Sequence, residues 1–154
     1  MCKKCCFTGH RPEKLVRSEM EVMIGLRRAI EQAIADGFDT FIAGMARGVD
    51  MWAAEIVLEL GMPLVAAVPC VEFPLHRDAS FDEAWRKRYD DILAQAKEVV
   101  YVAEGKEVVA AAYERDRWMV DHSERLIAVF DGTPGGTAHT IEYAKQKQVE
   151  IVYV

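Results

Sequence analysis

The chain has 154 residues, of which 51% are hydrophobic and 29% charged, a composition typical of one globular domain with its own core. Its formal net charge of -6 argues against broad binding to nucleic acid or to an anionic membrane, because both require a basic face. No apolar run approaches the length that spans a bilayer, and no signal-peptide pattern follows the first residue, so we expect a cytoplasmic protein.

Three of the four cysteines lie close together, at Cys2, Cys5 and Cys6, whereas Cys70 stands alone. A zinc site normally takes four ligands, often from two paired clusters, and no second cluster is spaced to complete one here. The four histidines are scattered and show no metal-ligand spacing either. We therefore expect Cys5 and Cys6 to be small apolar residues of a first strand in a reducing compartment, with no bound metal or other cofactor.

The N-terminal part of the chain predicts a strand, a polar loop and a helix. Residues 4–7 form an apolar opening strand, and residues 8–12 form a polar loop that contains a glycine and ends in a proline. Ser18 can cap the next helix with Glu21 as its capping-box partner, and Gly37 is placed to end that helix. Helical spacing predicts one buried face on this helix, made of Met23, Leu26, Ile30, Ala33 and Ile34.

The rest of the chain repeats this alternation of strand and helix. Apolar runs predict strands at residues 38–43, 63–68, 99–102, 126–130 and 149–154. Helices are predicted at residues 51–60, 81–96 and 107–122 and after a glycine-rich turn at 131–137, with a polar loop at 71–80. Strand and helix that alternate from end to end predict an α/β sandwich with a mostly parallel central sheet, in one domain over residues 1–154.

Residues 43–50 carry the first of two glycine-rich turns that join a buried strand to a helix. Gly44 and Gly48 let backbone approach a ligand closely, the start of the helix directs free N–H groups at it, and Arg47 adds a full positive charge. The anion that such a turn most often binds is a phosphate. The alternative is a plain strand–helix turn whose glycines only relieve backbone strain, and this stretch alone favours neither interpretation.

The turn at residues 131–137 repeats the arrangement after a later strand. Pro134 restricts one φ angle, Gly135 and Gly136 free the next two residues, and Thr137 begins the helix with a hydroxyl and an N–H group. Loops that follow parallel strands meet at one sheet edge, so both turns and the loop at residues 8–12 predict a single site. The expected ligand-binding residues are Thr8, Gly9, His10, Arg11, Gly44, Arg47, Gly48, Asp50, Glu55, Asp131, Gly132, Gly135, Gly136 and Thr137.

Three carboxylates near these turns, Asp50, Glu55 and Glu142, are expected to hold a ribose or to orient the arginines. Glu142 follows Thr137 by little more than one helical turn, so together with a nearby arginine it could assist the departure of a base from a ribose. The alternative is that Glu142 is a solvated carboxylate on a helix surface.

Several common site patterns are missing from the sequence. Neither the loop at residues 8–12 nor the turn at 43–50 has the G-x-G-x-x-G spacing of a dinucleotide site. No Gly-Lys-Ser/Thr triplet marks a P-loop, and no G-x-S-x-G marks a serine hydrolase. The sequence therefore favours neither a standard nicotinamide dehydrogenase nor a P-loop phosphatase.

Residues 6–12 (CFTGHRP), 43–55 (AGMARGVDMWAAE) and 116–121 (DRWMVD) resemble the YpsA-like family of the SLOG superfamily. The resemblance spans nearly the whole chain and implies a Rossmann-like three-layer sandwich that binds a nucleotide or a nucleotide-derived ligand. DNA-processing protein A, a related protein that binds single-stranded DNA, carries a similar glycine turn, in which Met45 of this chain replaces the second glycine.

The LOG phosphoribohydrolases are also related, and they cleave the base from nucleoside monophosphates with an arginine and a glutamate. Arg115 and Met119 match their Arg-x-x-x-Met segment. Residues 134–136 and Glu142 match the ends of their Pro-Gly-Gly-x-Gly-Thr-x-x-Glu motif, whereas residues 138–139 read Ala-His in place of Gly-Thr. This resemblance implies an acid/base role for Glu142 and an electrostatic role for Arg115.

The main functional hypothesis is a protein that binds a nucleotide-like small molecule in a sensing or regulatory role. One alternative is an enzyme that hydrolyses the N-glycosidic bond of a nucleotide with Glu142 and Arg115. Another is single-stranded nucleic-acid binding, against which the acidic charge argues. Aromatic helix positions such as Phe81 and Trp85 could also serve a homodimer.

Overall fold

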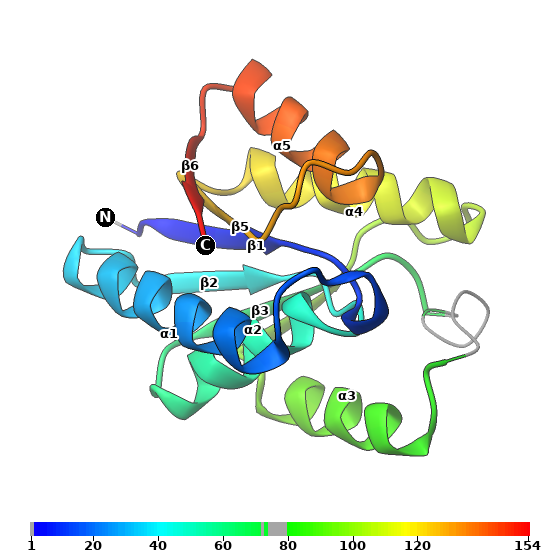
Figure 1. Ribbon diagram of the computed structural model, residues 1–154. Helices are drawn as coiled ribbons and strands as arrows, with labels where there is room; N and C mark the ends of the chain where they lie inside the picture. The colour runs from blue at the N-terminus through cyan, green and yellow to red at the C-terminus, as the bar shows by residue number, and fades with distance from the viewer. Residues whose placement is uncertain (1, 72, 74–79) are drawn as a thin grey trace.

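The computed structural model describes residues 2–71, 73 and 80–154, and within them six parallel strands form one sheet (Figure 1). The order across the sheet is β4-β3-β2-β1-β5-β6, and every neighbouring pair is parallel. This arrangement confirms the predicted parallel sheet. The strands are β1 (Lys4–Thr8), β2 (Thr40–Ala43), β3 (Leu64–Val68), β4 (Glu98–Tyr101), β5 (Arg125–Ala128) and β6 (Glu150–Tyr153).

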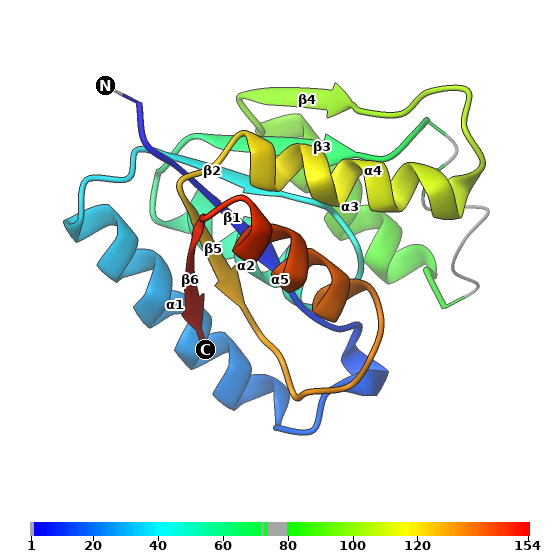
Figure 2. The same ribbon diagram turned by 90° about the horizontal axis from the view of Figure 1, so that it is seen from above.

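Helices cover both faces of the sheet and complete a three-layer sandwich (Figures 1 and 2). One face carries α1 (Glu19–Ala35), α2 (Val49–Glu59) and α3 (Glu83–Gln95). The other face carries α4 (Val108–Asp121) and α5 (Gly136–Gln146), and the short 3-10 helix η1 (Pro12–Lys14) lies in the loop after β1. The predicted Rossmann-like α/β fold is confirmed.

Alternate residues of the buried strands supply the two cores. Cys5 and Phe7 of β1 pack toward α1 and α2, whereas Cys6, between them, packs toward α4 and α5. Both cysteines are fully buried, as the sequence predicts, and burial raises the pKa of the Cys6 thiol to about 12. The middle positions of the central strands are therefore apolar because both faces of the sheet are covered.

Local signals set the helix ends much as the sequence predicts. The hydroxyl of Ser18 accepts a hydrogen bond from the Glu21 N–H group at 3.2 Å and caps α1. After α1, the N–H group of Phe38 donates to the Ala33 carbonyl at 2.9 Å and that of Gly37 donates to the Ile34 carbonyl. Because these closing bonds use the backbone up to Phe38, β2 begins at Thr40 rather than at residue 38.

The aromatic residues of α3 and its approach contact the rest of the chain. The ring of Trp85 lies 6.5 Å from that of Trp52 in α2, and the ring of Phe81 lies 5.7 Å from that of Tyr89. The face suggested for a homodimer is thus packed at least partly within the chain. Residues 72 and 74–79, which make up most of the predicted polar loop at 71–80, lie outside the described residues.

The path of the chain creates a switch point between β1 and β5. From β1 the chain proceeds outward through β2, β3 and β4, and then it returns to place β5 beside the other edge of β1. The loops after β1 and β5 consequently leave the sheet in opposite directions, and a crevice forms between them. None of the described helices is long and apolar enough to cross a membrane.

Candidate functional site

A cavity of about 470 Å³ lies at this switch point, beyond the carboxyl ends of β1 and β5. Its volume falls within the range typical of small-molecule sites. Its walls come from the end of β1 and the loop after it, the turn before α5, the middle of α4, the start of α2 and Phe73. The lining residues are Phe7, Thr8, Gly9, His10, Arg11, Lys14, Ala46, Asp50, Phe73, Ala112, Tyr113, Arg115, Asp116, Asp131, Thr133, Pro134, Gly135, Gly136 and Thr137.

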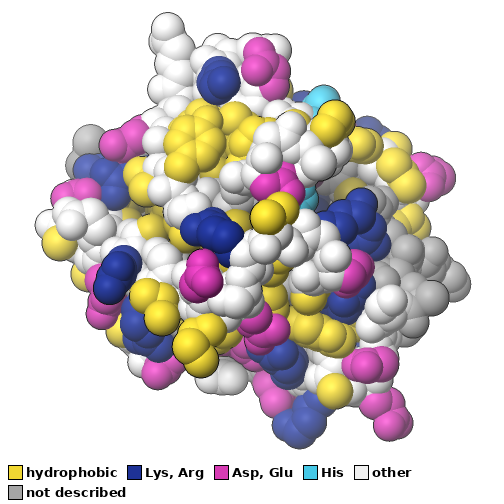
Figure 3. All heavy atoms as spheres, in the orientation of Figure 1, with side chains coloured by type: hydrophobic (Ala, Val, Ile, Leu, Met, Phe, Trp, Pro, Cys, Tyr) yellow, Lys and Arg dark blue, Asp and Glu magenta, His cyan; other side chains and the backbone are white. Residues whose placement is uncertain are grey.

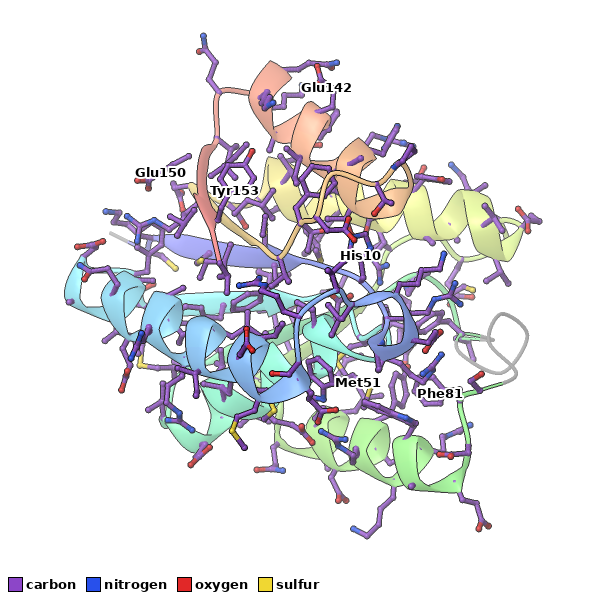
Figure 4. The ribbon with its side chains drawn as sticks, viewed as in Figure 1. His10, Met51, Phe81, Glu142, Glu150 and Tyr153 are labelled. Atoms are coloured by element: carbon purple, nitrogen blue, oxygen red, sulfur yellow. The ribbon has the colours of Figure 1, made fainter. Side chains whose placement is uncertain are left out.

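A hydrogen bond joins the two loops that face each other across the crevice. Nε2 of His10 lies 3.1 Å from Oδ1 of Asp131. Figure 4 shows His10, which belongs to the loop after β1, close to the turn before α5. The hydroxyl and the N–H group of Thr133 also donate to Oδ1 of Asp131. These hydrogen bonds, with His10, lower the pKa of Asp131 to about 2. The carboxylate therefore stays ionised and holds the rim of the cavity together.

The amino end of α5 opens into this cavity without a cap. Ser18, Asp82 and Glu107 cap the first turns of α1, α3 and α4 with their side chains. Gly135, at the N-cap of α5 with φ +146°, supplies no side-chain hydrogen bond, and neither Gly135 nor Gly136 has a described atom within 4 Å of an ideal β-carbon. The free N–H groups and the partial positive charge of the helix therefore face open space.

Two largely buried threonines line the same part of the cavity. Thr8 is 8% exposed and Thr137 is 5% exposed. Neither hydroxyl makes a hydrogen bond to any residue that the structure describes. Neither hydroxyl is among the buried side-chain atoms that lack a partner, so both are open to the cavity and add two hydrogen-bonding groups to the open helix end.

The turn at residues 44–48 is filled by the chain itself. The N–H group of Val49, at the start of α2, donates to the carbonyl of His10 at 3.4 Å. A β-carbon at Gly48 would lie 2.7 Å from that carbonyl oxygen, and a β-carbon at Gly9 would lie 2.5 Å from the side chain of Val49. Gly9 and Gly48 thus permit close packing between two loops, whereas Gly135 and Gly136 leave space.

Three charged residues form the floor of the cavity. Asp50 is 6% exposed and accepts a hydrogen bond from the Ala46 N–H group at 3.2 Å. Arg115 is 5% exposed; it donates to Asp116 at 2.8 Å, to the Ala67 carbonyl at 3.4 Å and to the Gly44 carbonyl. Burial raises the pKa of Asp50 to about 6, although the charge of Arg115 opposes this rise.

Several expected site residues do not line the cavity. Arg47 is buried elsewhere, where it pairs with Glu13 at 2.8 Å and lies over the ring of Trp85. Glu55 pairs with Arg88 of α3 and lines a separate groove between α1 and α2. Gly44 and Gly48 lie behind the floor and the loop after β1, and Gly132 is also absent from the lining. These residues were expected to face a ligand, and the structure gives Arg47 and Glu55 intramolecular partners instead.

The structure does not assemble the catalytic pair suggested by the LOG resemblance. Arg115 lies in the cavity floor, but Glu142 is exposed on α5 and does not line the cavity. Figure 4 shows Glu142 on the outer side of α5, away from His10. The physical reason is helical phase, because Ile141 and Ala144 pack inward and turn Glu142 outward.

Nine lining residues were not among the expected ones: Phe7, Lys14, Ala46, Phe73, Ala112, Tyr113, Asp116, Thr133 and Pro134. Helical spacing carried a signal for two of them, because Tyr113 and Asp116 lie three positions apart and next to Arg115 on α4. Lys14 reaches the cavity because the short helix η1 ends at this residue. A segment of three residues shows no repeating pattern, so the sequence carried no signal for it. Among the described residues, no group of three or more His, Cys, Asp or Glu side chains is placed to hold a metal ion.

A doubly wound sheet with a cavity at its switch point defines a protein of the Rossmann-like class. The family model YpsA, described as the YspA SLOG family, matches residues 5–153, so the chain belongs to that family. It is 30% identical over 154 residues to a UPF0398 protein of Bacillus thuringiensis (strain Al Hakam), over 94% of this chain and 84% of that protein. The family resemblance read from the sequence is confirmed.

Solved structures share the fold at low sequence identity. DNA processing protein A from Streptococcus pneumoniae matches with a TM-score of 0.70 and 17% identity, over 99% of this chain and 50% of that chain. The same protein from Helicobacter pylori, described for its single-stranded DNA binding mode, has a TM-score of 0.68, 15% identity, and coverages of 98% and 64%. The molybdenum cofactor carrier protein of Chlamydomonas reinhardtii has a TM-score of 0.65 and 16% identity, over 99% and 76%. This chain spans only part of each of these proteins.

Proposed function

We propose that this protein binds a phosphate-bearing, nucleotide-type small molecule in the cavity between the loops after β1 and β5, in a sensing or regulatory role. The observation that carries the proposal is the uncapped start of α5, which opens into the cavity beside the hydroxyls of Thr8 and Thr137. Backbone N–H groups at a helix start, together with hydroxyl donors, are suited to phosphate oxygens. Arg11 and Lys14, on the opposite wall, add positive charge.

The size and charge of the molecule favour a small ligand over a nucleic-acid strand. Among the structural neighbours, one is described as binding single-stranded DNA and another as carrying a cofactor, so both kinds of ligand have a precedent on this fold. On the face drawn in Figure 3, acidic and basic side chains are interspersed, and the whole chain carries a net charge of -6. A strand of nucleic acid needs a continuous basic track, which this distribution does not favour.

Binding can be measured by thermal shift and calorimetry with inorganic phosphate, AMP, ADP and NAD. A ligand that binds only the folded state raises the melting temperature. Substituting Thr137→Val removes one hydroxyl at nearly constant volume, and we expect affinity to fall about tenfold, because hydrogen bonds to charged groups contribute about 1.5–3 kcal/mol. Thr40→Val is the matched control, because Thr40 is the first residue of β2 and lies at the sheet edge opposite the cavity. This change should leave affinity unchanged.

Four outcomes would count against the proposal. If none of the four compounds binds, or if Thr137→Val binds them as the unchanged protein does, the cavity is not a phosphate site. Tight, steeply salt-dependent binding of single-stranded DNA would favour the nucleic-acid function instead. Release of free base from AMP would show a nucleotide N-glycosidase.

We further propose the cytoplasm as the compartment, since Cys5 and Cys6 are buried thiols.

A further inference from the structure

The floor of the cavity offers hydrogen-bond acceptors that the protein leaves partly unused. Asp50 is only 6% exposed. Of its two carboxylate oxygens, Oδ2 accepts a hydrogen bond from a described residue, the Ala46 N–H group. Its Oδ1 atom has no such partner within the described part of the chain. Oδ1 of Asp50 is not among the buried side-chain atoms that lack a hydrogen-bond partner, so this oxygen is open to the cavity that Asp50 lines.

Asp116 lies beside Asp50 on the same floor. Its Oδ1 atom accepts from Nε of Arg115 at 2.8 Å, and its side chain is 18% exposed. Nη1 of Arg115 donates to the carbonyls of Gly44 and Ala67. The arginine is thus engaged mainly with the protein itself. The floor therefore presents carboxylate oxygens, which accept hydrogen bonds, next to a guanidinium whose Nε and Nη1 atoms already donate to the protein.

The two ends of the cavity are accordingly opposite in character. The start of α5 and the two threonines supply donors, whereas Asp50 and Asp116 supply acceptors. A molecule that satisfies both ends carries an anionic group at one end and hydroxyl donors at the other. Hydroxyls can donate hydrogen bonds to both carboxylates without adding a charge to the floor.

We infer that Asp50 and Asp116 bind the vicinal hydroxyl pair of a ribose, so that the site selects ribose phosphates over deoxyribose phosphates and over phosphate alone. This inference rests on the proposed function, because it assumes that the phosphate lies at the start of α5. A site built to accept hydrogen bonds from two hydroxyls rejects an analogue that lacks one of them, because a buried acceptor then stays unpaired.

The test uses the full chain with three probes: inorganic phosphate, ribose 5-phosphate and 2-deoxyribose 5-phosphate. Affinities are measured by NMR titration or calorimetry. We expect the unchanged protein to bind ribose 5-phosphate about tenfold more tightly than 2-deoxyribose 5-phosphate. Asp50→Asn and Asp116→Asn should each reduce that preference below about threefold. These magnitudes correspond to the loss of one charge-assisted hydrogen bond.

Asp91→Asn is the matched control, since Asp91 is an exposed residue of α3 that pairs with Lys87 far from the cavity. It should keep the full ribose preference. Equal affinity for the two sugars in the unchanged protein, or a preference that survives in both floor variants, would overturn the inference while phosphate binding still upheld the proposed function. Failure of all three probes to bind would overturn both. If one floor variant fails to fold, the other still decides the question.

Discussion

At the scale of single residues, Asp50 is notable because its carboxylate charge is unfavourable in the buried place where it lies. It is a carboxylate in the first turn of α2, where the helix dipole favours negative charge. Burial has the opposite effect and dominates, so its pKa rises to about 6. Arg115 lowers this pKa and Asp116 raises it, and both face Asp50 from α4. Such a perturbed acid in a cavity is typical of a binding site rather than of a structural core.

Asp50 should make the stability of the unliganded protein depend on pH. In the folded state its pKa is raised, so the folded protein binds a proton more readily than the unfolded chain between about pH 4 and pH 6. Stability from this group is fully present below the unfolded pKa and is lost as the pH rises through about 6. Each pKa unit is worth about 1.4 kcal/mol, so the loss amounts to about 3 kcal/mol.

Urea denaturation of the unchanged protein and of Asp50→Asn between pH 4 and pH 8 measures this effect. We expect the variant to be more stable above pH 6 and the difference to vanish near pH 4. A difference that stays constant over this range would show that Asp50 does not titrate in it.

At the scale of elements, the two strand–helix turns look alike in sequence and differ in the structure. The start of α2 is covered by the His10 carbonyl and by the loop around η1, whereas the start of α5 is open. A glycine can serve either arrangement, because absence of a β-carbon permits close packing as well as ligand approach. Which of these applies depends on what the rest of the chain brings to the turn.

Substituting alanine for a glycine in each turn separates the two arrangements. Gly136 is the first residue of α5 and has open space around it, so Gly136→Ala should stabilise the protein by about 0.4–1 kcal/mol. The added methyl group should also weaken phosphate binding. Gly9→Ala places a methyl group 2.5 Å from Val49 and should destabilise the protein by about 1–3 kcal/mol. Urea denaturation and phosphate titration measure both effects, and a destabilised Gly136→Ala protein would contradict this account of the turn.

At the scale of the whole molecule, one sheet separates two apolar layers that share its strands. Cys6 of β1 belongs to the core under α4 and α5, and its neighbours Cys5 and Phe7 belong to the core under α1 and α2. If the strands separated from the helices of one layer, the apolar side chains that the same strands give to the other layer would also lose their packing. We therefore propose that residues 1–154 form a single cooperative domain.

The three tryptophans test this cooperativity, because Trp52 and Trp85 pack on one layer and Trp118 on the other. In urea, tryptophan fluorescence and the far-UV circular dichroism of the helices should change with the same midpoint. Variants with Trp52 and Trp85 replaced by Phe leave Trp118 as the sole reporter, and its transition should still coincide with the loss of helix. Separate midpoints for the two layers would contradict a single unit.

The sequence by itself determined the alternation of strands and helices, the caps of α1 and the loops that gather at one sheet edge. These features depend on short-range signals: apolar runs, helical spacing, and residues such as Ser18 and Gly37 at helix ends. From them the α/β class and the place of the candidate site follow, because parallel strands put their following loops on the same edge.

Only the tertiary structure decided which side chains reach the cavity. Arg47 turns to Glu13 and Trp85, Glu142 turns outward, and Asp116 joins the floor. These outcomes depend on contacts between residues far apart in the chain and on the rotation of each helix about its axis. A spacing pattern in one segment does not contain that information, since it shows which residues share a face but not what the face will meet.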